Sequence, residues 1–451
     1  MLVEFRVGNF LSFKDIQSFK LNADRSKQLK KHYSETSCGN ILNSAFIYGS
    51  NSSGKSNFIK AIQYSKKIIL NGLDPILDSD YYYKTTDNEI LCDPMYFEYI
   101  ILINNEKYSY GFETKVKEKN HNEIRTEFVD EWLYKLNRDG DECIFEKNHI
   151  FPNDIISADP KSPNNSENKR HLFLKKQYAT SSIKNSEIIT KIYEWFKNEL
   201  IVATNEMEDT FVGVPKDYIK ILNNILPKLD TGITEIVINE FKKTEIPLNL
   251  IKKFEKNDLN SVKYDTSKLL GEDAAIFIFG NEFKRYWLIY KKRTKSSNKY
   301  YEIRFKHGSE YEARIDEQST GTIRILYFIS ILSKILSKEK PNIAKTIFID
   351  EIESSLHPLI ISKLIDIFHE NNNFKYQLIS TTHETRFMDK NSVRNDEIWF
   401  IEHNYEPDYG KCSTIYSFKS FDYAGDIDDK KYLDGRFSAT PVFTNISFDE
   451  E

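Results

Sequence analysis

The sequence has few cysteines and prolines, and it contains no long hydrophobic run. Its four cysteines, Cys38, Cys92, Cys143 and Cys412, are too widely separated for a CxxC metal site or a dense disulfide framework. No run reaches the roughly 18 to 20 apolar residues of a membrane-spanning helix, and the N-terminus lacks a basic region followed by an apolar one. We therefore expect a cytoplasmic protein with no membrane association.

The chain also lacks the composition of a disordered or fibrous protein and a large excess of either charge. Of its 451 residues 40% are hydrophobic and 29% are charged, with only 16 glycines and 12 prolines. These proportions indicate a globular protein, and the length suggests two or three domains. A formal net charge of −5 excludes a protein that coats nucleic acid through its overall charge. The function must therefore be inferred from local motifs.

Hydrophobic spacing predicts strands and helices along most of the chain. Alternation predicts a β-hairpin over residues 1–21 and a meander of strands between 95 and 145. A polar segment at 152–170 indicates an internal boundary, and mainly helical spacing follows it. The C-terminal part alternates strands and helices, which is typical of α/β folds. Individual elements are predicted as strands at 45–48, 232–241, 276–305 (with a turn), 346–350 and 376–380, and as helices at 57–70, 183–200, 217–229, 322–337 and 358–369.

The strongest motif is a glycine-rich loop placed between a predicted strand and a predicted helix. Residues 49–56 read GSNSSGKS, which matches the pattern GxxxxGK[ST] of a P-loop. Backbone N–H groups of such a loop bind phosphates, the lysine reaches the β- and γ-phosphates, and the serine hydroxyl ligates Mg²⁺. No guanine-reading NKxD motif is present, so we predict ATP and Mg²⁺ as cofactors. The predicted nucleotide-binding residues are Gly49, Asn51, Gly54, Lys55, Ser56 and Asn57.

Two acidic residues end the predicted strand at 346–350 and complete the chemistry that a P-loop needs. Asp350 is expected to ligate the metal together with Ser56, and Glu351 is expected to act as the base that activates water. A strand can also end in acidic residues by chance. Beside a P-loop, the pair indicates hydrolysis of the bound nucleotide.

Two further motifs are similar to those of ABC-type ATPases. Ser319, Thr320 and Gly321 open a predicted helix before the acidic strand, where ABC ATPases carry the signature that binds the γ-phosphate held on the opposite protomer. Taken alone, these residues are also a good helix cap. His383 follows the next predicted strand, where ABC ATPases place a switch histidine. The resemblance implies that Glu351 and His383 are catalytic.

Most of the chain resembles the RecF-like and SMC-like branch of ABC ATPases, on the P-loop, the signature, DEIESSLHP at 350–358, STTHE at 380–384 and VGNFLSF at 7–13. Within that branch it is most similar to the stand-alone ATPases of bacterial abortive-infection and anti-phage systems, the AbiLi, RloA and PARIS AriA group. Residues 229–233 and 432–441 also fit that group. The resemblance implies an α/β ABC-type head with an N-terminal antiparallel β-subdomain and a mainly helical insertion.

The expected domains are an N-terminal part of the head at 1–150, the insertion at 151–270 and a C-terminal part of the head at 271–451. The resemblance implies a homodimer or higher homo-oligomer that sandwiches ATP, and a scaffold that controls a separately encoded effector such as a Toprim-type nuclease. No glutamine lies between Gln63 and Gln177, so the usual Q-loop has no candidate, which disfavours a transporter subunit.

An alternative function is a RecF-like repair ATPase that clamps duplex DNA. Between Lys284 and Lys306 there are nine Lys or Arg residues and one acid, interleaved with aromatic residues. Such a hairpin could hold a phosphate backbone and stack on bases, although a solvated hairpin has the same composition.

Overall fold

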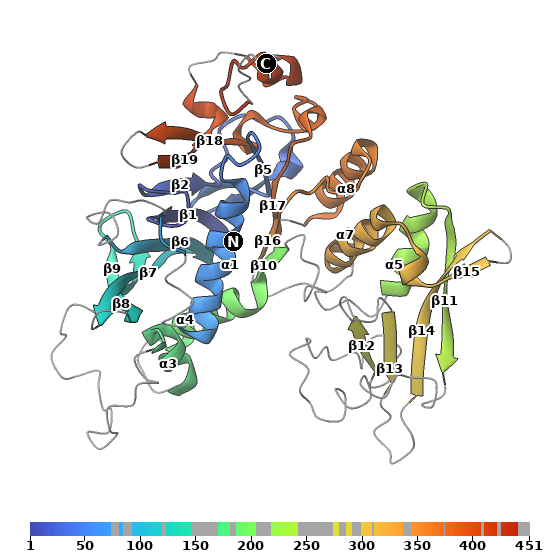
Figure 1. Ribbon diagram of the computed structural model, residues 1–451, viewed down its shortest axis with the longest axis horizontal. Helices are drawn as coiled ribbons and strands as arrows, with labels where there is room; N and C mark the ends of the chain where they lie inside the picture. Colours follow the sequence, from blue (N-terminus) through green and yellow to red (C-terminus); the bar gives the residue numbers. More distant parts are fainter. Residues whose placement is uncertain are drawn as a thin grey trace, which may run out of the picture. The chain divides into compact units, whose positions relative to one another are not determined.

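The structure is a computed structural model, and its internal contacts divide the chain into two units (Figure 1). The first unit comprises Met1–Val202, Asn342–Ile352 and Phe374–Glu451, and the second comprises Ala203–Pro341 and Glu353–Asn373. The three-part division expected from the sequence stays a prediction. The structure describes residues 1–73, 81–83, 93–119, 123–146, 170–180, 186–203, 218–241, 274–278, 286–290, 299–308, 311–336, 344–373, 375–406, 410–421 and 425–440.

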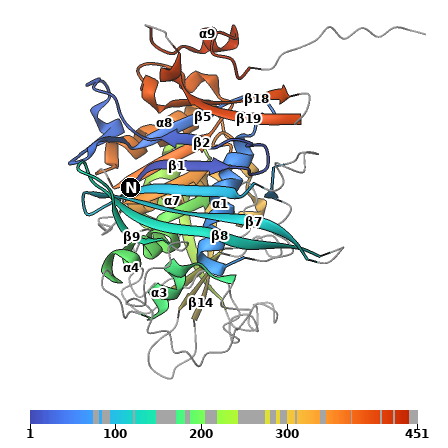
Figure 2. The same ribbon diagram turned by 90° about the vertical axis from the view of Figure 1, so that its left-hand side faces the viewer.

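The first unit begins with an antiparallel sheet in the order β2-β1-β6-β7-β8-β9. Its register pairs Phe5 with Phe19 and with Tyr99, so one face of the sheet collects large apolar side chains. Figure 2 shows β1, β7 and β8 within this sheet, where β6 separates β1 from β7. The strands are β1 (Leu2–Gly8), β2 (Gln17–Lys20), β6 (Met95–Ile103), β7 (Glu106–Lys119), β8 (Glu123–Leu136) and β9 (Glu142–Glu146).

The second sheet of this unit is mostly parallel, in the order β10-β16-β17-β5-β18-β19. Strands β16, β17, β5 and β18 pair in parallel, and β19 pairs antiparallel to β18. Parallel strands place their carboxyl ends at one edge, where ligands bind in α/β folds. The strands are β5 (Ser44–Tyr48), β10 (Leu200–Ala203), β16 (Lys345–Ile349), β17 (Tyr376–Thr381), β18 (Ile398–Glu406) and β19 (Gly410–Ser417).

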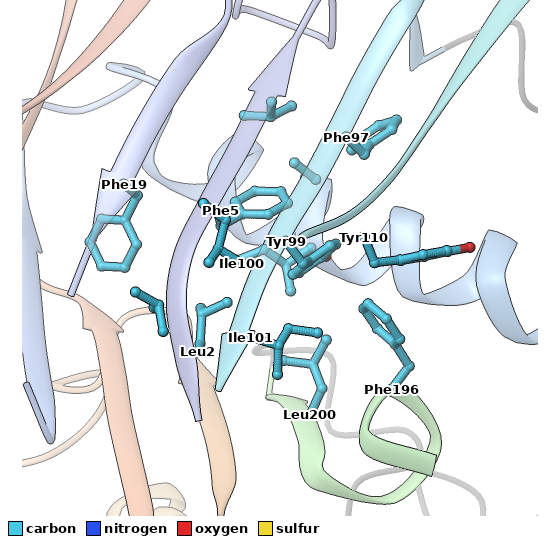
Figure 3. Close-up of a cluster of buried hydrophobic side chains, with 14 of the residues drawn as sticks. Leu2, Phe5, Phe19, Phe97, Tyr99, Ile100, Ile101, Tyr110, Phe196 and Leu200 are labelled. Atoms are coloured by element: carbon cyan, nitrogen blue, oxygen red, sulfur yellow. The ribbon is translucent and has the colours of Figure 1, made fainter. Parts of the chain in front are cut away.

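Helix α1 (Lys55–Asn71) lies between the two sheets. Its apolar residues recur at helical spacing, and the ring of Phe58 contacts Phe5 of the first sheet and Phe348 of the second at centroid distances of 5.7 and 6.5 Å. Figure 3 shows the adjoining core, in which Tyr99 and Tyr110 meet Phe196. This packing fixes the start of α1 relative to both sheets.

Shorter elements complete the first unit. A buried carboxylate, Glu131 of β8, accepts hydrogen bonds from the backbone N–H groups of Phe173 and Leu174 and thereby caps α3. The elements are β3 (Tyr33–Thr36), β4 (Gly39–Leu42), α3 (Phe173–Thr180), α4 (Ser186–Glu194), a π-helical turn (Trp195–Glu199) and α9 (Asp429–Leu433).

The second unit contains an antiparallel sheet in the order β11-β14-β13-β12, with β15 paired to β14. Helix α7 contacts α5 and α8, and α5 also contacts β11. The elements are α5 (Tyr218–Ile225), β11 (Ile233–Phe241), β12 (Ala274–Ile278), β13 (Tyr286–Tyr290), β14 (Lys299–His307), β15 (Tyr311–Ala313), α7 (Thr320–Leu336) and α8 (Pro358–Asn371).

The predicted α/β class with an N-terminal antiparallel sheet is confirmed. The helix predicted over 183–200 is confirmed as α4 and the π-helical turn that continues it to Glu199, and the apolar residues after it form the short strand β10. The polar boundary at 152–170 lies outside the described residues except for Arg170. None of the helices in the described ranges has the length and apolarity needed to cross a membrane.

Candidate nucleotide site

The P-loop connects the buried strand β5 to helix α1, as its sequence predicts. Gly54 is the N-cap of α1, and Lys55 is the first helical residue. The Lys55 ammonium is buried and donates to the carbonyl oxygens of Gly49 and Ser50 at 2.8 and 2.9 Å. The loop therefore curls around the lysine at the positive end of a 17-residue helix, an arrangement that favours anions.

Both motif glycines are required by close packing. A Cβ atom on Gly49 would lie 2.3 Å from the carbonyl oxygen of Ile401, and one on Gly54 would lie 2.4 Å from the Ser413 hydroxyl oxygen. Gly54 also has a φ of +117°, a conformation that other residues rarely adopt. Glycine is therefore required at these two positions by contacts with β18 and β19 as well as by phosphate binding.

The two acids after β16 are held by one hydroxyl on the neighbouring strand. Thr381 of β17 donates to a carboxylate oxygen of Asp350 at 2.6 Å and accepts a hydrogen bond from the backbone N–H of Glu351 at 2.8 Å. Glu351 adopts a left-handed conformation with a φ of 49°. Because β17 lies between β16 and β5, Thr381 joins the acids to the strand nearest the P-loop.

A hollow of about 430 Å³ opens over the P-loop. It brings together parts of three predicted motifs, since Glu351 and His383 line it with the loop. His383 is exposed there, directly after β17. Asp350 is not part of the lining. It precedes the lining residue Glu351 in the chain, and Thr381 is hydrogen-bonded to both residues. The lining residues are Ser12, Asn51, Ser52, Ser53, Gly54, Lys55, Ser56, Asn57, Glu351 and His383.

The donor set suits a hard cation. The Ser56 hydroxyl and the Asp350 carboxylate are oxygen ligands, which Mg²⁺ prefers, together with phosphate oxygens and water. Among the described residues of this hollow, no cysteine contributes to the lining, and the one imidazole belongs to His383. The residues present therefore fit magnesium.

The predicted signature lies in the second unit, at the start of α7. The Ser319 hydroxyl accepts a hydrogen bond from the Thr322 backbone N–H at 3.0 Å, which caps the helix. Ser319 and Thr320 are exposed, so the N-terminus of α7 is accessible to another molecule. A Cβ atom on Gly321 would lie 2.8 Å from the Ser355 carbonyl oxygen, which explains a glycine at this position.

The described parts of the basic segment, residues 286–290 and 299–306, belong to the antiparallel sheet of the second unit. Strands β13 and β14 pair through Trp287 with Glu302 and Tyr290 with Lys299, which confirms a strand on each side of the predicted turn. The part before the turn forms two antiparallel strands, β12 and β13, and not the single strand that was predicted. The turn predicted at 294–298 and Arg293 lie outside the described residues. Nucleic-acid binding by this segment stays a prediction.

Three functional candidates were not found from the sequence. Thr381, Ser12 and Ser413 touch the site from segments far apart in the chain. Ser12 lies within the VGNFLSF segment, for which the sequence predicts no role of its own. Thr381 precedes His383 by two residues within STTHE, so its proximity to the site was a usable signal. Ser413 lies on β19, and no local pattern marks it.

A family model described as an AAA domain, putative AbiEii toxin, Type IV TA system matches residues 44–389. No curated protein is significantly similar to the chain. Among solved structures, the SMC head bound to the C-winged helix domain of ScpA is 13% identical with a TM-score of 0.44, over 93% of this chain and 98% of that one. The SMC head domain from Thermotoga maritima is 12% identical with a TM-score of 0.37, over 92% and 98%.

The family match spans the P-loop, the signature, both acids and His383, and it covers well over half of the chain. The chain therefore belongs to the family of AAA domains described as putative AbiEii toxins of type IV toxin–antitoxin systems.

Proposed function

We propose that this protein is an ABC-type ATPase that binds Mg–ATP and hydrolyses it slowly, as the sensor or scaffold subunit of an anti-phage, abortive-infection defence system. The observation that carries the ATPase assignment is the hollow in which the P-loop, Glu351 and His383 meet. The family match supports the wider context.

Each residue has a defined role in this proposal. The backbone of Gly49–Gly54 and the start of α1 bind the phosphates, with Asn51 and Asn57 at their rim, and Lys55 neutralises their charge. Ser56 and Asp350 would hold Mg²⁺, which when bound screens the phosphate charge during transfer. Glu351 accepts the proton of the attacking water. His383, exposed at the same hollow, contacts the γ-phosphate side of the site.

Hydrolysis in this proposal requires a second copy of the chain. Ser319, Thr320 and Gly321 of one protomer close the site of its partner, since the exposed N-terminus of α7 offers a further anion site. Binding of ATP then favours the closed dimer, and hydrolysis releases it. Such a cycle suits a switch that controls a separately encoded nuclease or toxin rather than a fast motor.

The test separates binding from hydrolysis with two variants. Glu351→Gln should bind ATP with near wild-type affinity and lose most turnover, because the amide cannot accept the proton. Lys55→Ala should lose binding itself, since the phosphate charge is no longer neutralised. ATP affinity and single-turnover hydrolysis are measured for both, with wild type as reference. Turnover by Glu351→Gln at the wild-type rate would remove Glu351 from the mechanism.

The wider role is tested with tagged Glu351→Gln purified from its native host in ATP after nuclease treatment. A nuclease or toxin recovered in stoichiometric amount, and absent with Lys55→Ala, supports the scaffold. Recovery of the ATPase with protected DNA fragments alone would contradict it and favour the RecF-like clamp.

A further inference from the structure

A chain of hydrogen bonds spans the P-loop from outside. The Asn57 side-chain amide contacts the Ser12 hydroxyl at 2.9 Å, and the Ser12 hydroxyl contacts that of Ser413 at 2.8 Å. The Ser413 hydroxyl contacts the carbonyl oxygen of Ser53 at 2.6 Å. This series of hydrogen bonds thus begins in the first turn of α1 and ends on the P-loop.

The chemistry of these groups fixes the direction of the chain. A carbonyl oxygen only accepts, so the single hydroxyl proton of Ser413 goes to Ser53. Ser413 then accepts from Ser12, and Ser12 accepts from the amide of Asn57. Every group is used once as donor and once as acceptor between the two ends. The series of hydrogen bonds is therefore complete, and removal of the Ser12 or the Ser413 hydroxyl interrupts it.

The two ends of the chain enclose the residues expected to bind phosphate. Gly54, Lys55 and Ser56 lie between Ser53 and Asn57 in the sequence. We propose that Ser12 and Ser413 are positioning residues that hold this segment in the shape that binds the β- and γ-phosphates of ATP. The inference rests on the proposed function of the site and extends it to two residues outside the P-loop.

Packing leaves the segment little room to move. Ser413 is fully buried, and Ser53 is 1% exposed. A Cβ atom on Gly54 would lie 2.4 Å from the Ser413 hydroxyl and 3.0 Å from that of Ser12, so both serines lie directly against the glycine. Loss of the Ser413 hydroxyl would leave the Ser53 carbonyl without this donor in a buried place and would open space beside Gly54.

Ser12 lies in a hydrogen-bonded turn between two buried residues. Phe10 and Phe13, both fully buried, exchange backbone hydrogen bonds at 2.8 and 2.9 Å, which places Ser12 near the tip of the turn. The Ser413 backbone N–H donates to the Ser12 carbonyl at 2.7 Å, so the turn is also joined to β19. The antiparallel sheet and β19 thus act together on the P-loop.

The experiment compares ATP affinity in Ser413→Ala, Ser12→Ala and the double variant, with Thr414→Val as the matched control on the same strand. Each single variant should raise the Kd for Mg–ATP by about five- to tenfold, because the loop is then no longer held in its binding shape and must be ordered when ATP binds. The double variant should be little worse than either, because one break already interrupts the chain. Turnover at saturating ATP should stay within about twofold of wild type.

The melting temperature without nucleotide distinguishes positioning from stability. A lower melting temperature with unchanged Kd in both serine variants would overturn the inference, as would a Kd raised equally by Thr414→Val. Since Ser12 is only half-buried, Ser12→Ala provides the test if Ser413→Ala does not fold. If wild type fails to bind ATP, the proposed function fails as well; if wild type binds and Lys55→Ala does not, only the role of the serines is in question.

Discussion

At the scale of single residues, small polar side chains hold the predicted catalytic and metal-binding residues in place through hydrogen bonds. Thr381 is fully buried and holds both the Asp350 carboxylate and the backbone of Glu351. A left-handed backbone conformation raises the free energy of a residue other than glycine by about 1 kcal/mol or more, and Glu351 has this conformation. The hydrogen bond donated by its N–H group offsets part of this free energy. Thr381 therefore sets the direction in which the acidic side chain leaves the backbone.

We predict that Thr381→Val lowers hydrolysis and leaves ATP binding nearly unchanged. Valine keeps the volume but removes both hydrogen bonds, so Glu351 and Asp350 lose their orientation, while the P-loop residues that bind the phosphates are untouched. Turnover should fall between about tenfold and a hundredfold. Single-turnover rates and ATP affinity are measured beside Thr381→Ser, which keeps the hydroxyl and should retain most activity. Equal rates for the valine variant and wild type would show that the hydroxyl has no part in hydrolysis.

At the scale of elements, one buried amide joins the two sheets of the first unit. The Gln377 side chain on β17 accepts from the Leu2 N–H at 2.7 Å and from the Thr346 hydroxyl at 2.8 Å. It donates to the carbonyl oxygens of Leu2 and Leu42 at 2.9 and 3.0 Å. Both amide protons and the amide oxygen are therefore satisfied, and β1, β4 and β16 are all tied to β17.

We predict that Gln377→Leu destabilises the protein by about 3 kcal/mol or more, because it leaves up to four buried polar groups without these partners. Urea unfolding measures the change as a lower midpoint. Gln28→Met, at an exposed position, is the control and should unfold at the wild-type midpoint. Coincident curves for Gln377→Leu and wild type would mean that the amide does not hold the sheets together.

At the scale of the whole molecule, the residues proposed for one catalytic site are distributed over two units. Lys55, Glu351 and His383 belong to the first unit, and the signature residues belong to the second. A composite site formed by two copies of the chain would make hydrolysis depend on protein concentration, because an isolated protomer supplies only one half of each site.

We predict that two inactive variants restore activity when mixed, if their defects lie in opposite halves of the site. Lys55→Ala and Ser319→Arg should each be inactive. A mixed dimer has one intact site, so an equal mixture should reach about one quarter of the wild-type turnover. A mixture of Lys55→Ala and Glu351→Gln should stay inactive, since both residues come from the same protomer. The absence of recovery in the first mixture would contradict the composite site.

Elements and motifs with local signals could be predicted from the sequence. The hairpin of β1 and β2, helix α1 and strands β16 and β17 follow from hydrophobic spacing, and the P-loop follows from its pattern of glycines. The short strand β10 could not be predicted, because a four-residue apolar segment after a helix fits either state.

The residues that support the site could be identified only from contacts between distant parts of the chain. Ser12 and Ser413 are 401 positions apart, and Leu2 and Gln377 are 375 apart. Serine, threonine and glutamine are common polar residues with no periodic signal, so nothing in the nearby sequence predicts their partners. Their roles come from the parallel sheet, which brings the ends of β5, β16 and β17 to one edge, and from β19, which lies against Gly54. The motif residues are set by the local chemistry of phosphate binding, whereas the residues that position them are set by which strands become neighbours.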